Sequence, residues 1–152
     1  MKKMLLTALL ALTISASCFA EGAASRFAAE EKAADTLISA ITGSTVTYDA
    51  VSRSFRQGLK TNLTADKFAA LKDEIKKQVG TIKNANFVLL NKPFNFEKGY
   101  NGADELVYIG SVAKDKFARI FIIFALENNA PKINGFQVTP LEAKKPEAPA
   151  KK

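Results

Sequence analysis

Histidine is absent from the 152-residue chain, and cysteine occurs once, at Cys18. Without histidine the chain lacks the usual general base, the usual proton shuttle and the commonest metal ligand. A single cysteine forms no intrachain disulfide, and without histidine it makes no ordinary zinc site. The sequence also contains no phosphate loop, dinucleotide fingerprint or calcium loop. We therefore expect no metal and no cofactor.

The first 20 residues have the pattern of a cleavable secretory signal. Lys2 and Lys3 precede an apolar stretch over residues 5–14, and small residues follow up to Ala20. This stretch is far shorter than the roughly 20 residues needed to cross a bilayer. We predict a signal peptide over residues 1–20 and an exported mature protein, periplasmic or secreted. The alternative is a lipoprotein signal in which Cys18 becomes lipidated.

The net charge of +7 is concentrated near the two ends of the chain. Lys2 and Lys3 belong to the predicted signal, and residues 143–152 carry four lysines against Glu147. Residues 21–142 retain 16 basic and 14 acidic residues, which is close to balance. We therefore predict no nucleic-acid partner and no transmembrane segment in the mature chain. The Lys/Pro/Ala tail is typical of a disordered end, or of a weak tether to an anionic envelope surface.

Helical signals come first in the remaining sequence. Apolar residues recur at helical spacing through residues 27–41. Thr47 is placed to cap a second, shorter helix, and Thr64 to begin a third helix that ends before Gly80. One apolar stripe marks the third helix. It consists of Phe68, Leu71, Ile75 and Val79.

Beyond Gly80 the apolar pattern changes to that of β-strands, with short loops of the kind that join antiparallel neighbours. The predicted strands are residues 87–90, 106–112, 117–126 and 133–138. The sequence therefore predicts one α+β domain over residues 21–142. Its two or three N-terminal helices would pack on one face of an antiparallel sheet of about four strands.

The order of elements also resembles a known family. Helices are followed by a bent strand containing phenylalanine and proline, and then by a meander whose last strand carries the string Lys132-Ile133-Asn134-Gly135-Phe136. This order is similar to the cystatin-like fold of the nuclear transport factor-like superfamily, and within it to small exported bacterial domains of unknown function. The resemblance implies a shape rather than an activity, since the superfamily includes dimeric binding modules and a few enzymes.

Alternation sorts the side chains of the predicted meander onto two faces. A three-residue loop at residues 114–116 would place Ser111 opposite Arg119. A five-residue loop at residues 127–131 would place Leu126 opposite Lys132 and Ile122 opposite Phe136. One face is then continuously apolar and suited to cover by the helices. It comprises Leu106, Tyr108, Val112, Ile120, Ile122, Phe124, Phe136 and Val138.

The opposite face, which we call the outer face, mixes large apolar residues with polar ones. It comprises Val107, Ile109, Ser111, Arg119, Phe121, Ile123, Gln137 and Thr139. An apolar patch rimmed by polar groups is typical of an interaction surface. We predict that it forms a homodimer, or binds a small molecule or an envelope protein, with Arg119 as its polar anchor. The alternative is cover by the chain's own loop, residues 91–103, through Phe94, Phe96 and Tyr100.

Carboxylates provide the one enzymatic alternative. Glu97, Asp104 and Glu105 surround a glycine-rich turn, close to Tyr100 and Tyr108. The resemblance allows an isomerase or hydrolase that uses an aspartate base and a tyrosine donor, but no catalytic motif of the family maps onto these positions. Charged residues beside such a turn are ordinary loop residues. The sequence therefore favours a non-enzymatic binding or assembly module.

Overall fold

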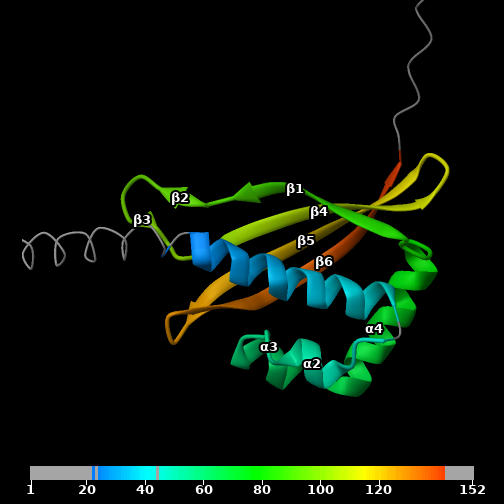
Figure 1. The fold of residues 1–152 in the computed structure, drawn as a ribbon, viewed down its shortest axis with the longest axis horizontal. Coiled ribbons are helices and arrows are strands. Elements are labelled where there is room, and N and C mark those ends of the chain that lie inside the picture. The colour runs from blue at the N-terminus through cyan, green and yellow to red at the C-terminus, as the bar shows by residue number, and fades with distance from the viewer. Residues whose placement is uncertain (1–21, 23, 44, 143–152) are drawn as a thin grey trace, which may run out of the picture.

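The computed structural model describes residues 22, 24–43 and 45–142. The predicted signal peptide with Cys18 and the basic tail at residues 143–152 lie outside the described residues. Four helices come first along the described chain (Figure 1). They are residues 24–42, α2 (Tyr48–Ser52), α3 (Gln57–Asn62) and α4 (Ala65–Gln78). No helix in this part of the chain has both the length and the apolar character of a membrane span.

The helix ends follow the predicted signals in most places. Thr47 is the N-cap of α2, and its side chain accepts a hydrogen bond from the backbone N–H of Ala50. Thr64 stands at the N-cap of α4, although its side chain makes no capping hydrogen bond. Gly80 follows α4 with a φ of 97°, a left-handed conformation that glycine adopts without strain. The short helix α3 was not predicted, because six residues are too few to establish a periodic pattern.

The strands follow the helices and form a four-stranded antiparallel sheet in the order β1-β4-β5-β6. Its strands are β1 (Asn84–Asn91), β4 (Asp104–Ala113), β5 (Lys116–Glu127) and β6 (Ala130–Glu142). Between β1 and β4 the chain makes a separate small hairpin from β2 (Phe94–Asn95) and β3 (Gly99–Tyr100). The predicted α+β class is confirmed.

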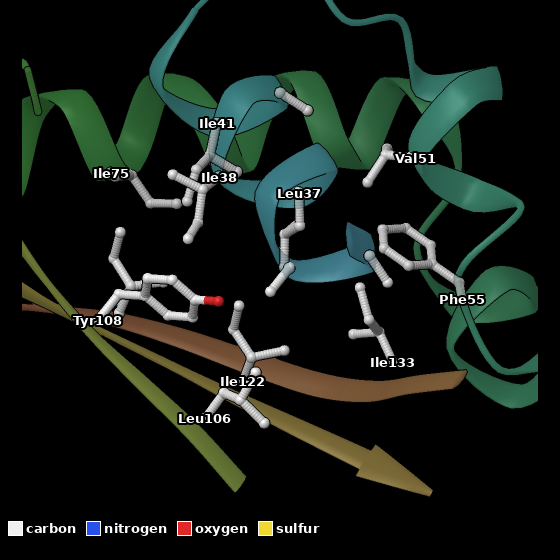
Figure 2. Close-up of a cluster of buried hydrophobic side chains, with 14 of the residues drawn as sticks. Leu37, Ile38, Ile41, Val51, Phe55, Ile75, Leu106, Tyr108, Ile122 and Ile133 are labelled. Carbon is white, nitrogen blue, oxygen red and sulfur yellow. The ribbon is translucent and has the colours of Figure 1, made fainter. Parts of the chain in front are cut away.

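The hydrophobic core lies between the helices and one face of the sheet, which we call the inner face (Figure 2). Leu37 from the first helix, with Val51 and Phe55, meets Ile122 and Ile133 from the sheet. All five side chains are buried. Burying a side chain of this size contributes about 1.5–3 kcal/mol, so this layer accounts for much of the stability of the domain. The predicted inner face is confirmed.

The pairing of β4 with β5 differs from the prediction by two residues. Ser111 pairs with Phe117 rather than with Arg119, and Arg119 pairs with Ile109. The turn is tighter than expected, and the register shifts between Ser111 and Ala113, so the extra residue lies within β4. Asp115 occupies this turn with a φ of 61°. A shift of two residues returns every side chain to the same face, and the predicted faces therefore stand.

The pairing of β5 with β6 was predicted correctly only along part of its length. Ile122 lies opposite Phe136 as expected, but Leu126 pairs with Pro131 instead of Lys132. The five-residue loop was wrong because the turn consists of Asn128 and Asn129, with φ of 52° and 61°. Asparagine tolerates this left-handed conformation, which tight hairpins require.

Candidate binding surface on the outer face of the sheet

Consecutive residues of the central strands differ in burial. In β4 the buried positions alternate with half-buried ones from Asp104 to Gly110, and in β5 they alternate with exposed or half-buried ones from Ala118 to Phe124. Buried residues point to the helices, and the more exposed ones form the outer face. Figure 1 shows the helices along one side of the sheet and no described helix along its other side. The described part of the chain therefore leaves the outer face accessible.

The registers arrange the outer face in four rows that run across the strands from β1 to β6. They are Asn91, Glu105, Ile123 and Gly135; Leu89, Val107, Phe121 and Gln137; Asn86, Ile109, Arg119 and Thr139; and Asn84, Ser111, Phe117 and Leu141. All eight residues predicted for this face lie on it. Leu89 and Phe117, which were not predicted for this face, are 52% and 39% exposed and extend the apolar area.

Arg119 and Glu105 are the two charged residues within these four rows. Arg119 is exposed, and it makes no ion pair or side-chain hydrogen bond with any other described residue. Glu105 is half-buried and accepts a hydrogen bond from Asn91 Nδ2 at 2.6 Å. They lie on different strands and on rows either side of the Phe121 row. One cation and one carboxylate thus flank an apolar centre.

The loop after β1 does not cover this face. Phe94 and Phe96 are 62% and 98% exposed and contact each other, with ring centroids 5.8 Å apart. Tyr100 instead donates its hydroxyl hydrogen bond to Asp104, which is on the inner face. The small β2–β3 hairpin lies beside the start of the first helix (Figure 1). Cover by residues 91–103, the alternative from the sequence, is therefore wrong.

Three surface depressions are found elsewhere on the described chain. One of about 350 Å³ lies between the end of the first helix and α4, near Gly43 and Lys72. A second, of about 460 Å³, lies along the first helix near Asp35, and a third, of about 440 Å³, lies between Arg56 and Glu127. None of the three is lined by an outer-face residue. All three therefore lie away from the outer face.

A buried polar cluster joins the first helix, the hairpin and β4 on the inner side. It comprises Arg26, Glu30, Lys92, Tyr100 and Asp104. Arg26 donates from Nε to Glu30 at 3.0 Å and pairs through Nη2 with Asp104 at 3.1 Å. Lys92 Nζ and the Tyr100 hydroxyl also donate to Asp104. Glu30 and Asp104 are both fully buried, whereas the Lys92 side chain is 50% exposed and Tyr100 is 38% exposed, so the cluster fixes the hairpin to the helix at the edge of the core.

The two carboxyl groups of this cluster have opposite pKa shifts. Burial raises the pKa of Glu30, and the negative charge of Asp104 adds to the effect although Arg26 opposes it. Burial also acts to raise the pKa of Asp104, but the hydrogen bonds from Tyr100 and Lys92 outweigh it and hold that pKa below its usual value. Glu30 Oε2 has no hydrogen-bond partner among the described atoms.

The structure separates the carboxylates that the sequence places around the turn. Asp104 is buried, Glu105 is on the outer face, and Glu97 is exposed on the hairpin. Tyr108 lies in the core, where burial raises its pKa to about 12. Asp104 does contact Tyr100, but three donors already occupy its oxygens. This arrangement serves to hold the fold together.

Neither a serine–lysine pair nor a metal-binding cluster is assembled among the described residues. Ser111 and Lys114 have the Ser-x-x-Lys spacing found in some serine enzymes. They lie at the end of β4 and in its turn, where three residues span about 10 Å, whereas a helix would make them neighbours. Within the described ranges, no group of three or more acidic, histidine or cysteine residues is placed to hold a metal ion.

No protein-family model, curated protein or solved structure matches the chain. The resemblance to the cystatin-like fold therefore stays a prediction. The function has to be inferred from the geometry of the outer face and of the buried cluster.

Proposed function

We propose that the protein is an exported, non-enzymatic binding or assembly module that acts through the outer face of its sheet. The observation that supports this function is the one-sided cover of the sheet. The helices bury the inner face, whereas Val107, Ile109, Phe121 and Ile123 on the outer face stay partly in contact with water. Contiguous apolar area of this kind on a small domain is characteristic of an interaction surface.

The shape of the surface favours a protein partner. A small molecule gains most of its binding energy by being enclosed in a concave site. The outer face has no such hollow among the depressions described above, and its apolar residues are spread over all four rows. A second extended surface would bury them together, as sheets do when they pack face to face.

Export supports the same interpretation. The N-terminal pattern predicts export to a compartment where cytosolic cofactors are not supplied. The predicted mature domain also contains no cysteine, so it forms no disulfide there. In its polar cluster Arg26 forms ion pairs with Glu30 and with Asp104, which supply rigidity rather than a reactive group. A rigid sheet with one open face is suited to binding by surface contact.

Photo-crosslinking in intact bacterial cells tests this function. A photoreactive phenylalanine analogue would replace Phe121 on the outer face, and the same analogue at Asp73, which is exposed on α4, would serve as the matched control. We expect covalent adducts from position 121 and none from position 73. If position 121 gives no adduct with any protein, the proposed function is wrong. Cell fractionation of the same samples checks export.

A further inference from the structure

We infer that the partner of the outer face is a second copy of this chain, packed face to face about a two-fold axis that runs across the strands over the row of Val107 and Phe121. This inference rests on the proposed function and specifies its partner. It depends on three features of the outer face, which are its area, the order of its rows and the positions of its two charges.

The area is of the size that a dimer requires. Four strands spaced about 4.8 Å apart and about ten residues long cover about 600 Å². A stable interface buries about 800 Å² on each partner, and corrugated side chains expose more than the flat area beneath them. The apolar residues Leu89, Val107, Phe121 and Ile123 lie within this area. One complete sheet face is therefore enough for an isologous dimer.

The two charges select the direction of the axis. With the axis across the strands, the row of Glu105 in one copy faces the row of Arg119 in the other. Facing sheets lie about 10 Å apart, and the neighbouring strand adds about 4.8 Å sideways, so the two backbones are about 11 Å apart. An extended arginine and glutamate together span this distance. Symmetry then forms the same ion pair twice, on either side of Phe121.

The alternative two-fold axis, parallel to the strands, is unfavourable. It would bring the Arg119 row of one copy over the Arg119 row of the other. That row otherwise contains Asn86, Ile109 and Thr139, so it has no carboxylate. Two desolvated guanidinium groups would then lie close together without a counter-charge, which disfavours this packing. In the favoured arrangement, the exposed guanidinium of Arg119 gains a partner that no described residue of its own chain provides.

Charge exchange tests the inference on the full chain, expressed in bacteria and purified in the form that accumulates. The variants are Arg119→Glu, Glu105→Arg and the double exchange, and sedimentation equilibrium measures the dimer dissociation constant of each. The matched control is Lys67→Glu, an equal change of charge on exposed α4. Circular dichroism verifies that every variant is folded.

We expect a wild-type dimer whose dissociation constant rises about tenfold or more in each single variant, because like charges then face each other across the interface. The double exchange should restore most of the affinity, and Lys67→Glu should leave it unchanged. The inference is wrong if the wild type is monomeric at all concentrations. It is also wrong if the wild type is a dimer whose dissociation constant is the same in the single variants.

The crosslinking result separates the two hypotheses. An adduct of twice the chain mass from position 121 agrees with the dimer. A monomeric protein that crosslinks from position 121 to a different protein overturns the dimer and leaves the proposed function standing. The absence of any adduct overturns both.

Discussion

Phe121 and Ile122 are consecutive residues of β5 with opposite environments. Ile122 is fully buried under the helices, whereas Phe121 is half-buried on the outer face. Strand alternation requires them to point to opposite faces of the sheet, and the described helices cover only the inner face. The larger aromatic side chain is thus the one left accessible. The proposed interaction surface and the core are separated by a single peptide unit.

This relationship predicts unequal effects of two neighbouring truncations. Ile122→Ala should lower the free energy of unfolding by about 2–5 kcal/mol, because it leaves a cavity in a packed core. Phe121→Ala, measured at a concentration low enough to keep the chain monomeric, should lower it by about 1 kcal/mol or less. Urea denaturation of the two variants checks both values. Equal losses would show that the outer face is sealed within one chain.

The buried cluster predicts a second effect on stability. Asp104→Ala should lower the free energy of unfolding by about 3 kcal/mol, since Arg26 and Lys92 lose their buried counter-charge. Glu97→Ala, on the exposed part of the same hairpin, should change it by about 0.5 kcal/mol or less. The measurement is again the urea midpoint. A mild effect at Asp104 would mean that the hairpin is not fixed by this cluster.

Much of the fold could be predicted from local patterns. The apolar stripe of Phe68 and Ile75 identifies α4, and alternation from Leu106 to Val112 identifies the body of β4. Whether a segment is a helix or a strand, and which side chains face the core, depend on the spacing of nearby residues, so these features could be predicted from the sequence. The hairpin β2–β3 was missed because each strand has only two residues. Register was missed because one extra residue in β4 and one in β6 shift the alternation locally, and the sequence does not show where these bulges lie.

The polar cluster could be predicted only in part. Asp104 and Tyr100 are close in sequence and were predicted to be neighbours. Arg26 lies 74 residues before Tyr100, and no sequence pattern connects Arg26 with these two residues. One signal was present in the helix. Glu30 stands four residues before Ala34 and seven before Leu37, which places a carboxyl group on the buried stripe. A charge in that position indicates a buried partner.

Glu30 also predicts a pH dependence. Its pKa is raised in the folded protein, mainly by burial, so this group contributes stability below its unfolded pKa of about 4.3. The contribution is lost as the pH rises through the folded pKa. Asp104, whose pKa is lowered, acts in the opposite direction and contributes stability above about pH 3.9, which is lost as the pH falls.

Glu30→Gln isolates the first contribution. The variant keeps the shape of the side chain and cannot ionise, and its amide can donate toward Asp104. We expect its stability relative to wild type to increase as the pH rises from about 4 to neutral. Urea denaturation across this pH range measures the difference, and Glu31→Gln at the adjacent position is the control. A constant difference between Glu30→Gln and wild type would contradict the raised pKa.

Two glycines predict opposite responses to the same substitution. A Cβ at Gly110 would lie 2.5 Å from Ile82 Cγ2 in the core, so Gly110→Ala should lower the free energy of unfolding by about 1–3 kcal/mol. Gly58 in α3 has open space around it, and Gly58→Ala should raise that free energy by about 0.5–1 kcal/mol. Thermal and urea unfolding would show whether the two changes have opposite signs.

Hydroxyl-radical footprinting of the outer face, as a function of protein concentration, tests the central claim most directly. Phe96 at the exposed hairpin provides the internal reference, because it is 98% exposed in the single chain. If the outer face binds a second copy, oxidation of Phe121 falls as the concentration rises, while oxidation of Phe96 stays constant. If oxidation of Phe121 is the same at every concentration, the outer face does not associate with itself and the dimer is wrong.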